Sequence, residues 1–314
     1  MEEFRANPAY RILSPIAEGG MGAVYLAEQK GIAGFRKTVA LKTILPSLLE
    51  DEETLDLFVG EAKLVADLIH ENILQVYHLD EKDGQIYLVM EYVFGKSLDK
   101  LSERLRDMGE LLPVDLAAFI ISRVCRALDY AHRKKDRSGN PLGIVHRDIT
   151  PSNIIVQFGG VVKLADFGIA KALTMNIPDE HDVIMGKYAY MAPEMARFQG
   201  TDPRSDLFGL GLVGYEILTG KRVYDAENSS ELLDRMENYL IPPPRKLLPD
   251  IPESLSDIIM HALEMNPENR YQSAHEMGNA LEHFLYDDGY GPTNEKLGDY
   301  MAELFAETLK EAYG

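Results

Sequence analysis

The sequence predicts an α+β protein with two parts, a small and mainly antiparallel β part with one key helix and a larger, mainly helical part. The pattern changes near residue 93, from short β-branched and aliphatic runs to long helical periodicities. The chain has 314 residues, 46% of them hydrophobic, which suits one large unit or two lobes with a buried core. The expected divisions are residues 1–93, 94–288 and a helical extension over 289–314.

The first part is expected to form a small sheet. Its candidate strands are separated by turn residues and lie at 10–17, 23–29, 38–44, 73–79 and 85–92. One helical stretch, 55–69, interrupts them.

The second part carries longer helical patterns. They cover 113–133, 205–220 with a glycine at its end, 254–265 and 266–286. Between the first two, "RKKDRSGNPLG" has the turn chemistry of a short polar hairpin, at Ser138, Gly139, Asn140 and Pro141.

Charge and cysteine content exclude several classes of protein. The 32 basic and 51 acidic residues give a net charge of −19, which argues against nucleic acid or an anionic membrane as partner and allows a preference for basic substrates. Cys125 is the single cysteine, so no internal disulfide forms and a reducing cytoplasm is expected. The first residues lack an export signal, and no apolar run reaches 18 residues, so we expect no membrane span.

Two segments of the first part suggest phosphate chemistry. "AEGGMGAVY" (17–25) is a glycine-rich turn between strands, which lets the backbone approach phosphate oxygens. "VALK" places Lys42 on a strand, and Glu61, nineteen residues later on the predicted helix, can orient its ammonium group by an ion pair. Alone, the first is a loose hairpin and the second a surface lysine.

Two further segments supply carboxylates. "HRDITPSN" (146–153) offers Asp148 as a proton acceptor and Asn153 as a metal ligand, and "ADFG" (165–168) offers Asp166 as a second hard oxygen ligand for magnesium. "APE" follows at 192–194. The order of all these segments is far more specific than any one of them.

In that order the segments resemble the eukaryotic-like (Hanks-type) serine/threonine protein kinases, and "GGMGAVYLA" resembles their bacterial branch. The resemblance covers about residues 10–285. It implies the bilobed kinase fold with ATP and Mg²⁺, or Mn²⁺, in the cleft, and a hinge at Glu91, Tyr92 and Val93. The nucleotide-binding positions that it implies are Ala17, Gly19, Gly20, Gly22, Val24, Ala40, Lys42, Met90, Glu91 and Val93.

The resemblance also assigns scaffold and catalytic roles. Asp206 matches the aspartate that anchors the HRD backbone, and Glu194 is expected to pair with Arg270. Asp148 becomes the base that orients a serine or threonine hydroxyl of a protein substrate during in-line transfer of the γ-phosphoryl group.

Three residues depart from the family pattern. Ala17 replaces the first glycine of the loop, and Phe208 replaces a tryptophan. Thr150 stands where a lysine is usual, while Lys187 stands where the activation segment usually has a threonine. We expect these two side chains to have exchanged roles, so that Lys187 supplies the ammonium group; the alternative is a solvated Lys187 and a Thr150 that only caps a turn.

Two rival functions remain. A pseudokinase scaffold would usually have lost Lys42, Asp148 or Asp166, and all three are present. A phosphotransferase that acts on small molecules is disfavoured by "APE" and "SDLFGLG", which belong to the peptide-binding half of the fold.

The extension has its own apolar stripe. Leu297, Met301, Leu304, Phe305 and Leu309 recur at helical spacing. The favoured interpretation is a helix packed on the chain's own surface, and the alternative is self-association or partner docking through it.

Overall fold

The computed structural model describes most of the chain and separates it into two units. The described residues are 9–19, 22–45, 52–167, 189–197, 199–224, 229–238 and 240–313. Among them, the first unit holds residues up to 69 and 74–93, and the second holds 70–73 and those from 94 onward.

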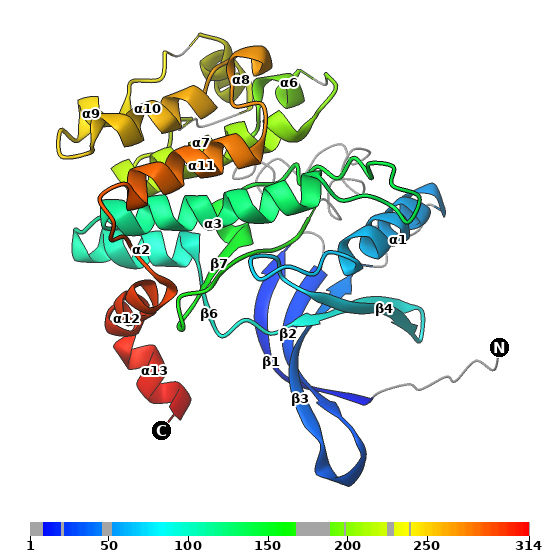
Figure 1. Cartoon of the computed structure of the whole chain (residues 1–314). Coiled ribbons are helices and arrows are strands. Elements are labelled where there is room, and N and C mark those ends of the chain that lie inside the picture. The colour runs from blue at the N-terminus through cyan, green and yellow to red at the C-terminus, as the bar shows by residue number, and fades with distance from the viewer. Residues whose placement is uncertain are drawn as a thin grey trace. The chain divides into compact units, whose positions relative to one another are not determined.

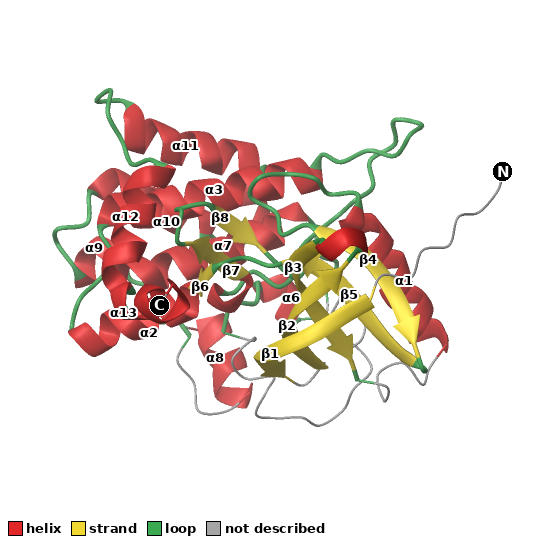
Figure 2. Ribbon diagram, turned by 90° about the horizontal axis from the view of Figure 1, so that it is seen from below, coloured by secondary structure: helices red, strands yellow, loops and turns green. Residues whose placement is uncertain are grey.

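The first unit is built on one antiparallel sheet of five strands in the order β1-β2-β3-β5-β4, which Figure 2 shows in yellow. The strands are β1 (Ala9–Gly19), β2 (Gly22–Lys30), β3 (Arg36–Ile44), β4 (Val76–Lys82) and β5 (Gln85–Glu91). A 3₁₀ turn (Ile32–Gly34) joins β2 to β3, and one helix, α1 (Glu52–Ala66), follows β3. The predicted small sheet with one helix is confirmed.

The two faces of this sheet differ in chemistry. Alternate residues of β2, β3 and β5 form an apolar cluster of Ala27, Val39, Leu41 and Val89, against which Tyr10, Tyr25 and Tyr87 pack. The opposite face carries Lys42 between its partners Val24 and Leu88, because residues directly across a ladder share a face.

The second unit is mainly helical (Figure 1). Its helices are α2 (Leu98–Met108), α3 (Val114–His132), α6 (Pro193–Ala196), α7 (Pro203–Thr219), α8 (Ser229–Asn238), α9 (Pro244–Leu247), α10 (Glu253–Ala262) and α11 (Ala274–Tyr286). Every residue of α7 from Ser205 to Thr219 is buried, and α3, α10 and α11 pack against it. Gly220 ends α7 in the left-handed conformation, with φ 68°, as its place in the sequence predicts.

Three very short strands form a second sheet, β6 (Gly95–Ser97), β7 (Ile154–Gln157) and β8 (Val162–Leu164). Residues 70–73 join this unit, because Asn72 Nδ2 donates to the Val162 carbonyl at 2.8 Å and Ile73 bridges to Leu164. The apolar pattern that begins at residue 73 is therefore divided, and β4 starts only at Val76.

The helical pattern over 266–286 is also divided. A 3₁₀ turn (Pro267–Asn269) comes first, and α11 begins at Ala274 because Ser273 caps it: its Oγ accepts the Glu276 amide at 3.2 Å. The predicted polar hairpin is present, with a bridge from Lys135 to Pro141 and Asp136 Oδ1 accepting the amides of Ser138 and Asn140.

The extension forms two helices, α12 (Asn294–Leu304) and α13 (Ala306–Tyr313), that break at Phe305. Leu297, Met301 and Leu304 are buried, and a Cβ on Gly298 would lie 3.0 Å from the backbone of Gly159 in the β7–β8 turn. The helix packed on the chain's own surface is thus confirmed for α12, while Leu309 belongs to the separate α13. Within the described residues, none of the helices combines the length and apolarity needed to cross a bilayer.

Candidate active site

The catalytic loop (His146–Asn153) is anchored by one buried carboxylate from α7. Asp206 is 1% exposed and accepts the His146 amide at 2.8 Å and the Arg147 amide at 2.7 Å. Burial alone would raise the pKa of Asp206, but hydrogen bonds from His132 and the His146 amide lower it, so it stays ionised. The predicted anchor is confirmed, and Arg147 takes a left-handed φ of 63° beside it.

His146 connects this loop to the strand that precedes Asp166. Its Nδ1 accepts the Asp148 amide at 3.2 Å, and its Nε2 lies 3.0 Å from the Ala165 carbonyl, so Nε2 carries the hydrogen. Complete burial lowers the pKa of His146 and keeps the ring neutral. The Phe167 ring packs on it, with 4.5 Å between ring centroids.

Asp148 and Asn153 are held together inside the loop. Asn153 Nδ2 donates to both the carbonyl and the Oδ2 of Asp148, each at 2.9 Å. Asp148 is 6% exposed. These bonds fix the direction of the carboxylate and use only the nitrogen of the Asn153 amide, leaving its oxygen for another partner.

Asp166 lies one residue beyond Ala165, whose amide donates to the Asn153 carbonyl at 2.8 Å. Asp166 has a φ of 55°, a conformation uncommon for a residue with a side chain and found often at functional sites. The Asp166 carboxylate and the Asn153 amide oxygen are hard donors of the kind Mg²⁺ prefers. The chemistry of these two donors therefore fits a magnesium ion.

Thr150, the unusual residue of the loop, is 5% exposed, and its Oγ1 lies 2.9 Å from the Ser152 hydroxyl. Its predicted counterpart Lys187 lies outside the described residues. The exchange of roles between the two stays a prediction.

In the first unit, four of the predicted nucleotide-binding residues share one sheet face: Val24, Ala40, Lys42 and Met90. Ala40 pairs with Met90, and Lys42, two residues further on β3, pairs with Val24 on β2. Ala40 and Met90 are buried, and Lys42 is half-buried. Glu91 and Val93 follow Met90 at the end of β5, where the Glu91 amide donates to the Gln75 carbonyl at 2.9 Å.

The glycine-rich segment closes the β1–β2 hairpin. Gly22 has a φ of 137°, and a Cβ there would lie 1.9 Å from the Thr43 carbonyl oxygen, so only glycine fits. Ala17 pairs with Val24, and Gly19 pairs with Gly22. Gly20 and the side chain of Glu61 on α1 lie outside the described part of the chain.

Glu194 and Arg270 form the predicted buried ion pair. Arg270 donates from Nη1 and Nη2 to the two oxygens of Glu194, each at 2.8 Å, and Ser205 Oγ donates to Oε1 at 2.7 Å. Burial raises the pKa of Glu194, but these hydrogen bonds outweigh it and the net pKa is lowered. The guanidinium also lies over the Phe208 ring, 4.7 Å from its centroid, so this replacement for tryptophan serves the scaffold.

The sequence analysis missed one residue that supports the catalytic loop. His132, at the end of α3, contacts Asp206 Oδ2 through Nε2 at 2.8 Å. A single histidine at a helix end gives no signal for a partner 74 residues away; only the fold brings them together.

Comparison with known proteins decides the family. The family model described as "Protein kinase domain" matches residues 10–284. The chain belongs to this family. Among relatives, it is 37% identical over 298 residues to the tyrosine-protein kinase MasK of Myxococcus xanthus (strain DK1622), covering 95% of this chain and 46% of MasK. It is 34% identical to the serine/threonine-protein kinase PrkC of Bacillus subtilis (strain 168), covering 87% of this chain and 40% of PrkC.

Solved structures agree with the fold. The crystal structure of the PknI kinase domain of Mycobacterium tuberculosis superimposes with a TM-score of 0.67 at 28% identity, covering 88% of this chain and 96% of that one. This kinase domain therefore spans less than half the length of MasK and PrkC but nearly all of an isolated kinase domain.

Proposed function

We propose that the chain transfers the γ-phosphoryl group of ATP to serine or threonine hydroxyls of proteins. The observation that carries this proposal is the catalytic loop, in which Asp148 is directed by Asn153 and the loop backbone is held by Asp206. A scaffold without catalysis would have no need for a carboxylate fixed in this way. Relatives named serine/threonine-protein kinases, PrkC among them, support the choice of acceptor.

In this mechanism each residue has a limited task. Asp148 orients the acceptor hydroxyl and takes its proton, while Lys42 neutralises charge on the phosphates. Asn153 and Asp166 would hold Mg²⁺, which would supply positive charge next to the phosphates. Positioning and charge neutralisation supply most of the acceleration, because the transition state is loose.

The net charge of −19 supports acceptor segments rich in lysine or arginine. The single cysteine, Cys125, is buried and free, which suits a reducing cytoplasm.

The test is phosphate incorporation from labelled ATP with Mg²⁺ into a basic carrier protein, followed by phosphoamino-acid analysis. Wild-type protein is expected to give phosphoserine and phosphothreonine, and Asp148→Asn to lose about 100-fold or more of kcat. MasK is named a tyrosine kinase. If phosphotyrosine were the only product, the acceptor would be tyrosine instead of serine or threonine, while the proposed transfer of phosphate from ATP would stand. Equal incorporation by wild type and Asp148→Asn would overturn the proposal.

A further inference from the structure

The chain passes from the first unit to the second at Phe94, and aromatic rings connect this residue to the extension. Val93 belongs to the first unit and Phe94 to the second. The Phe94 ring meets the Phe158 ring edge-on, with 4.9 Å between centroids, and Phe158 meets Phe305 edge-on, with 6.1 Å between centroids. Phe158 lies in the β7–β8 turn, and Phe305 follows the last residue of α12. Three segments far apart in the sequence therefore form one row of rings.

Backbone contacts fix the segment that begins with Phe94. The Phe158 amide donates to the Phe94 carbonyl at 3.1 Å, and β6 starts at the next residue, Gly95, opposite Gln157 on β7. A Cβ on Gly95 would lie 2.2 Å from the Val156 carbonyl oxygen, so the two strands approach as closely as glycine allows. The segment that leaves the hinge is thus attached to β7 and the turn after it.

The extension is held close to the same turn. Thr293 caps α12, with its hydroxyl oxygen accepting the Lys296 amide at 3.2 Å, and the Lys296 ammonium pairs with Asp115 of α3. A Cβ on Gly160 would lie 1.7 Å from the Asn294 carbonyl oxygen. These contacts fix the start of α12 on the second unit, so the ring at its end has a defined place.

Phe305 lies at the break between α12 and α13 and is half-buried. Its amide donates to the Met301 carbonyl at 3.1 Å. Lys96 of β6 places its ammonium group over the Phe305 ring, 5.8 Å from the centroid, in a cation–π arrangement. Phe305 therefore contacts the β7–β8 turn through Phe158 and the strand after the hinge through Lys96.

We propose that Phe305 is a positioning residue for nucleotide binding and acts on the hinge through Phe158 and Phe94. The inference rests on the proposed function, in which the hinge backbone would bind the adenine ring. The Val93 carbonyl belongs to the rigid peptide group that joins Val93 to Phe94, so the place of Phe94 helps to set the direction of this carbonyl. Hydrogen bonds depend on direction. Loss of the Phe305 ring should therefore weaken ATP binding and spare the transfer step.

The test measures nucleotide binding apart from transfer. The full chain and its variants are titrated with a fluorescent ATP analogue and Mg²⁺, and kcat and KM for ATP are measured with a basic carrier protein. Phe305→Ala should raise the Kd of the analogue and the KM for ATP about 3- to 10-fold, the range that one aromatic pair can supply. Its kcat at saturating ATP should stay within about 2-fold of wild type. Phe305→Tyr keeps the ring and should restore the affinity.

The matched control is Tyr300→Ala on the same helix. Burial and the carboxylates of Glu110 and Glu303 raise the pKa of Tyr300 to about 12, which places this ring beside the loop between α2 and α3. The control removes an aromatic side chain from α12 and leaves the row of three rings intact. It should therefore leave the affinity for ATP unchanged, even where it lowers the stability of the fold.

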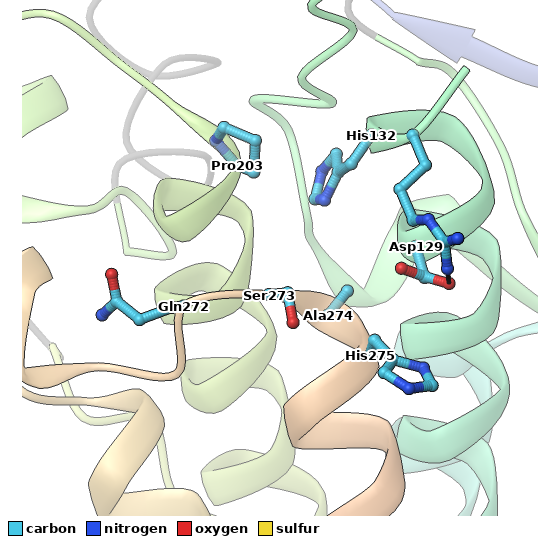
Figure 3. A pocket seen from close by; sticks show the side chains of 8 residues that line it. Asp129, His132, Pro203, Gln272, Ser273, Ala274 and His275 are labelled. Carbon is cyan, nitrogen blue, oxygen red and sulfur yellow. Dashed lines mark hydrogen bonds and ion pairs between the residues drawn. The ribbon is translucent and has the colours of Figure 1, made fainter. Parts of the chain in front are cut away.

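A second control addresses binding of the analogue elsewhere in the second unit. A pocket of about 380 Å³, within the size range of small-molecule sites, opens where the end of α3 meets the starts of α7 and α11 (Figure 3). His275→Ala changes an exposed residue of its lining and should leave the affinity unchanged. Weaker binding in His275→Ala with unchanged binding in Phe305→Ala would place the nucleotide in this pocket and overturn the proposal.

Failure of the inference differs from failure of the proposed function. If wild-type protein bound no ATP, both would be wrong. If wild type and Phe305→Ala bound ATP equally well, or if Phe305→Ala lost kcat at an unchanged KM, the function would stand and the positioning role would be wrong. Should Phe305→Ala fail to fold, Phe305→Leu decides, because it keeps an apolar side chain and lacks only the ring; unchanged affinity in Phe305→Leu contradicts the proposal.

Discussion

The catalytic loop and strand β3 each carry a residue that the proposed reaction needs, but the two are positioned in different ways. The loop is held by side chains distant in sequence, with Asp206 bonded to the amides of His146 and Arg147. Lys42 lies in the middle of β3, where backbone register places it between Val24 and Leu88.

This difference separates stability from activity. A buried carboxylate that loses its partners is costly, so substitutions in the network around the loop should destabilise the fold as well as impair transfer. The half-buried Lys42 can be replaced while the backbone ladder of β3 remains, so its loss should reduce activity more than stability.

The largest effect on stability is expected from a substitution of Glu194. Glu194→Gln leaves the Arg270 guanidinium, whose side chain is fully buried, without its counter-charge and should cost about 3–5 kcal/mol of unfolding free energy. The matched control is Glu253→Gln, which removes an exposed pair with Arg245 and should cost about 0–1 kcal/mol. Urea unfolding of both variants measures the difference; equal losses would contradict the account.

The same pair predicts a pH dependence. The folded-state pKa of Glu194 is lowered, so its contribution is present above the ordinary pKa of a glutamate and is lost as the pH falls through the lower, folded value. As the pH falls below the ordinary glutamate pKa of about 4.3, wild-type protein should therefore lose stability more steeply than Glu194→Gln does. Parallel curves from thermal melts across this range would show that Glu194 does not contribute.

Variants of Thr150 and Lys187 test whether the catalytic loop needs an ammonium group from the activation segment. Removing a charge aimed at the transition state costs about 100-fold in kcat, so Lys187→Ala should lose that much while its affinity for ATP changes little. Thr150→Lys alone should impair the enzyme, and the double variant Thr150→Lys, Lys187→Thr should recover much of the activity. Wild-type kcat in Lys187→Ala would end the exchange hypothesis.

The smallest expected effect is on the stability of the fold where α12 packs against the β7–β8 turn. Gly298→Ala on α12 places a methyl group 3.0 Å from the Gly159 backbone and should destabilise the fold by about 1–3 kcal/mol. Gly60→Ala on α1 is the control, since nothing lies within 4 Å of its Cβ; it should stabilise by about 0.5–1 kcal/mol. Destabilisation of similar size in both variants would contradict close packing of the extension.

The sequence predicted what its local patterns encode. Alternation gave the five strands around Lys42, and the motifs gave Asp148, Asn153 and Asp166. It missed β6, β7 and β8, because three or four residues are too few to show a period. It also missed α2, a short helix with three buried leucines.

Contacts between residues distant in the sequence could not be predicted from local patterns. The Asp206 anchor and the Glu194–Arg270 pair were expected only through resemblance to the family. His132 has no motif, and the break at Phe305 has no glycine or proline to mark it. Both arise from packing of one element on another, which composition and spacing do not encode.

The most direct test measures stability and transfer on the same preparations of Asp206→Asn and Lys42→Met. Asp206→Asn places an amide against the two loop amides and should lose about 2 kcal/mol or more of unfolding free energy together with activity. Lys42→Met should lose about 100-fold or more of kcat but less unfolding free energy than Asp206→Asn loses. If Asp206→Asn kept both stability and activity, or if Lys42→Met were the variant that unfolded, the account of how the two regions are held would be contradicted.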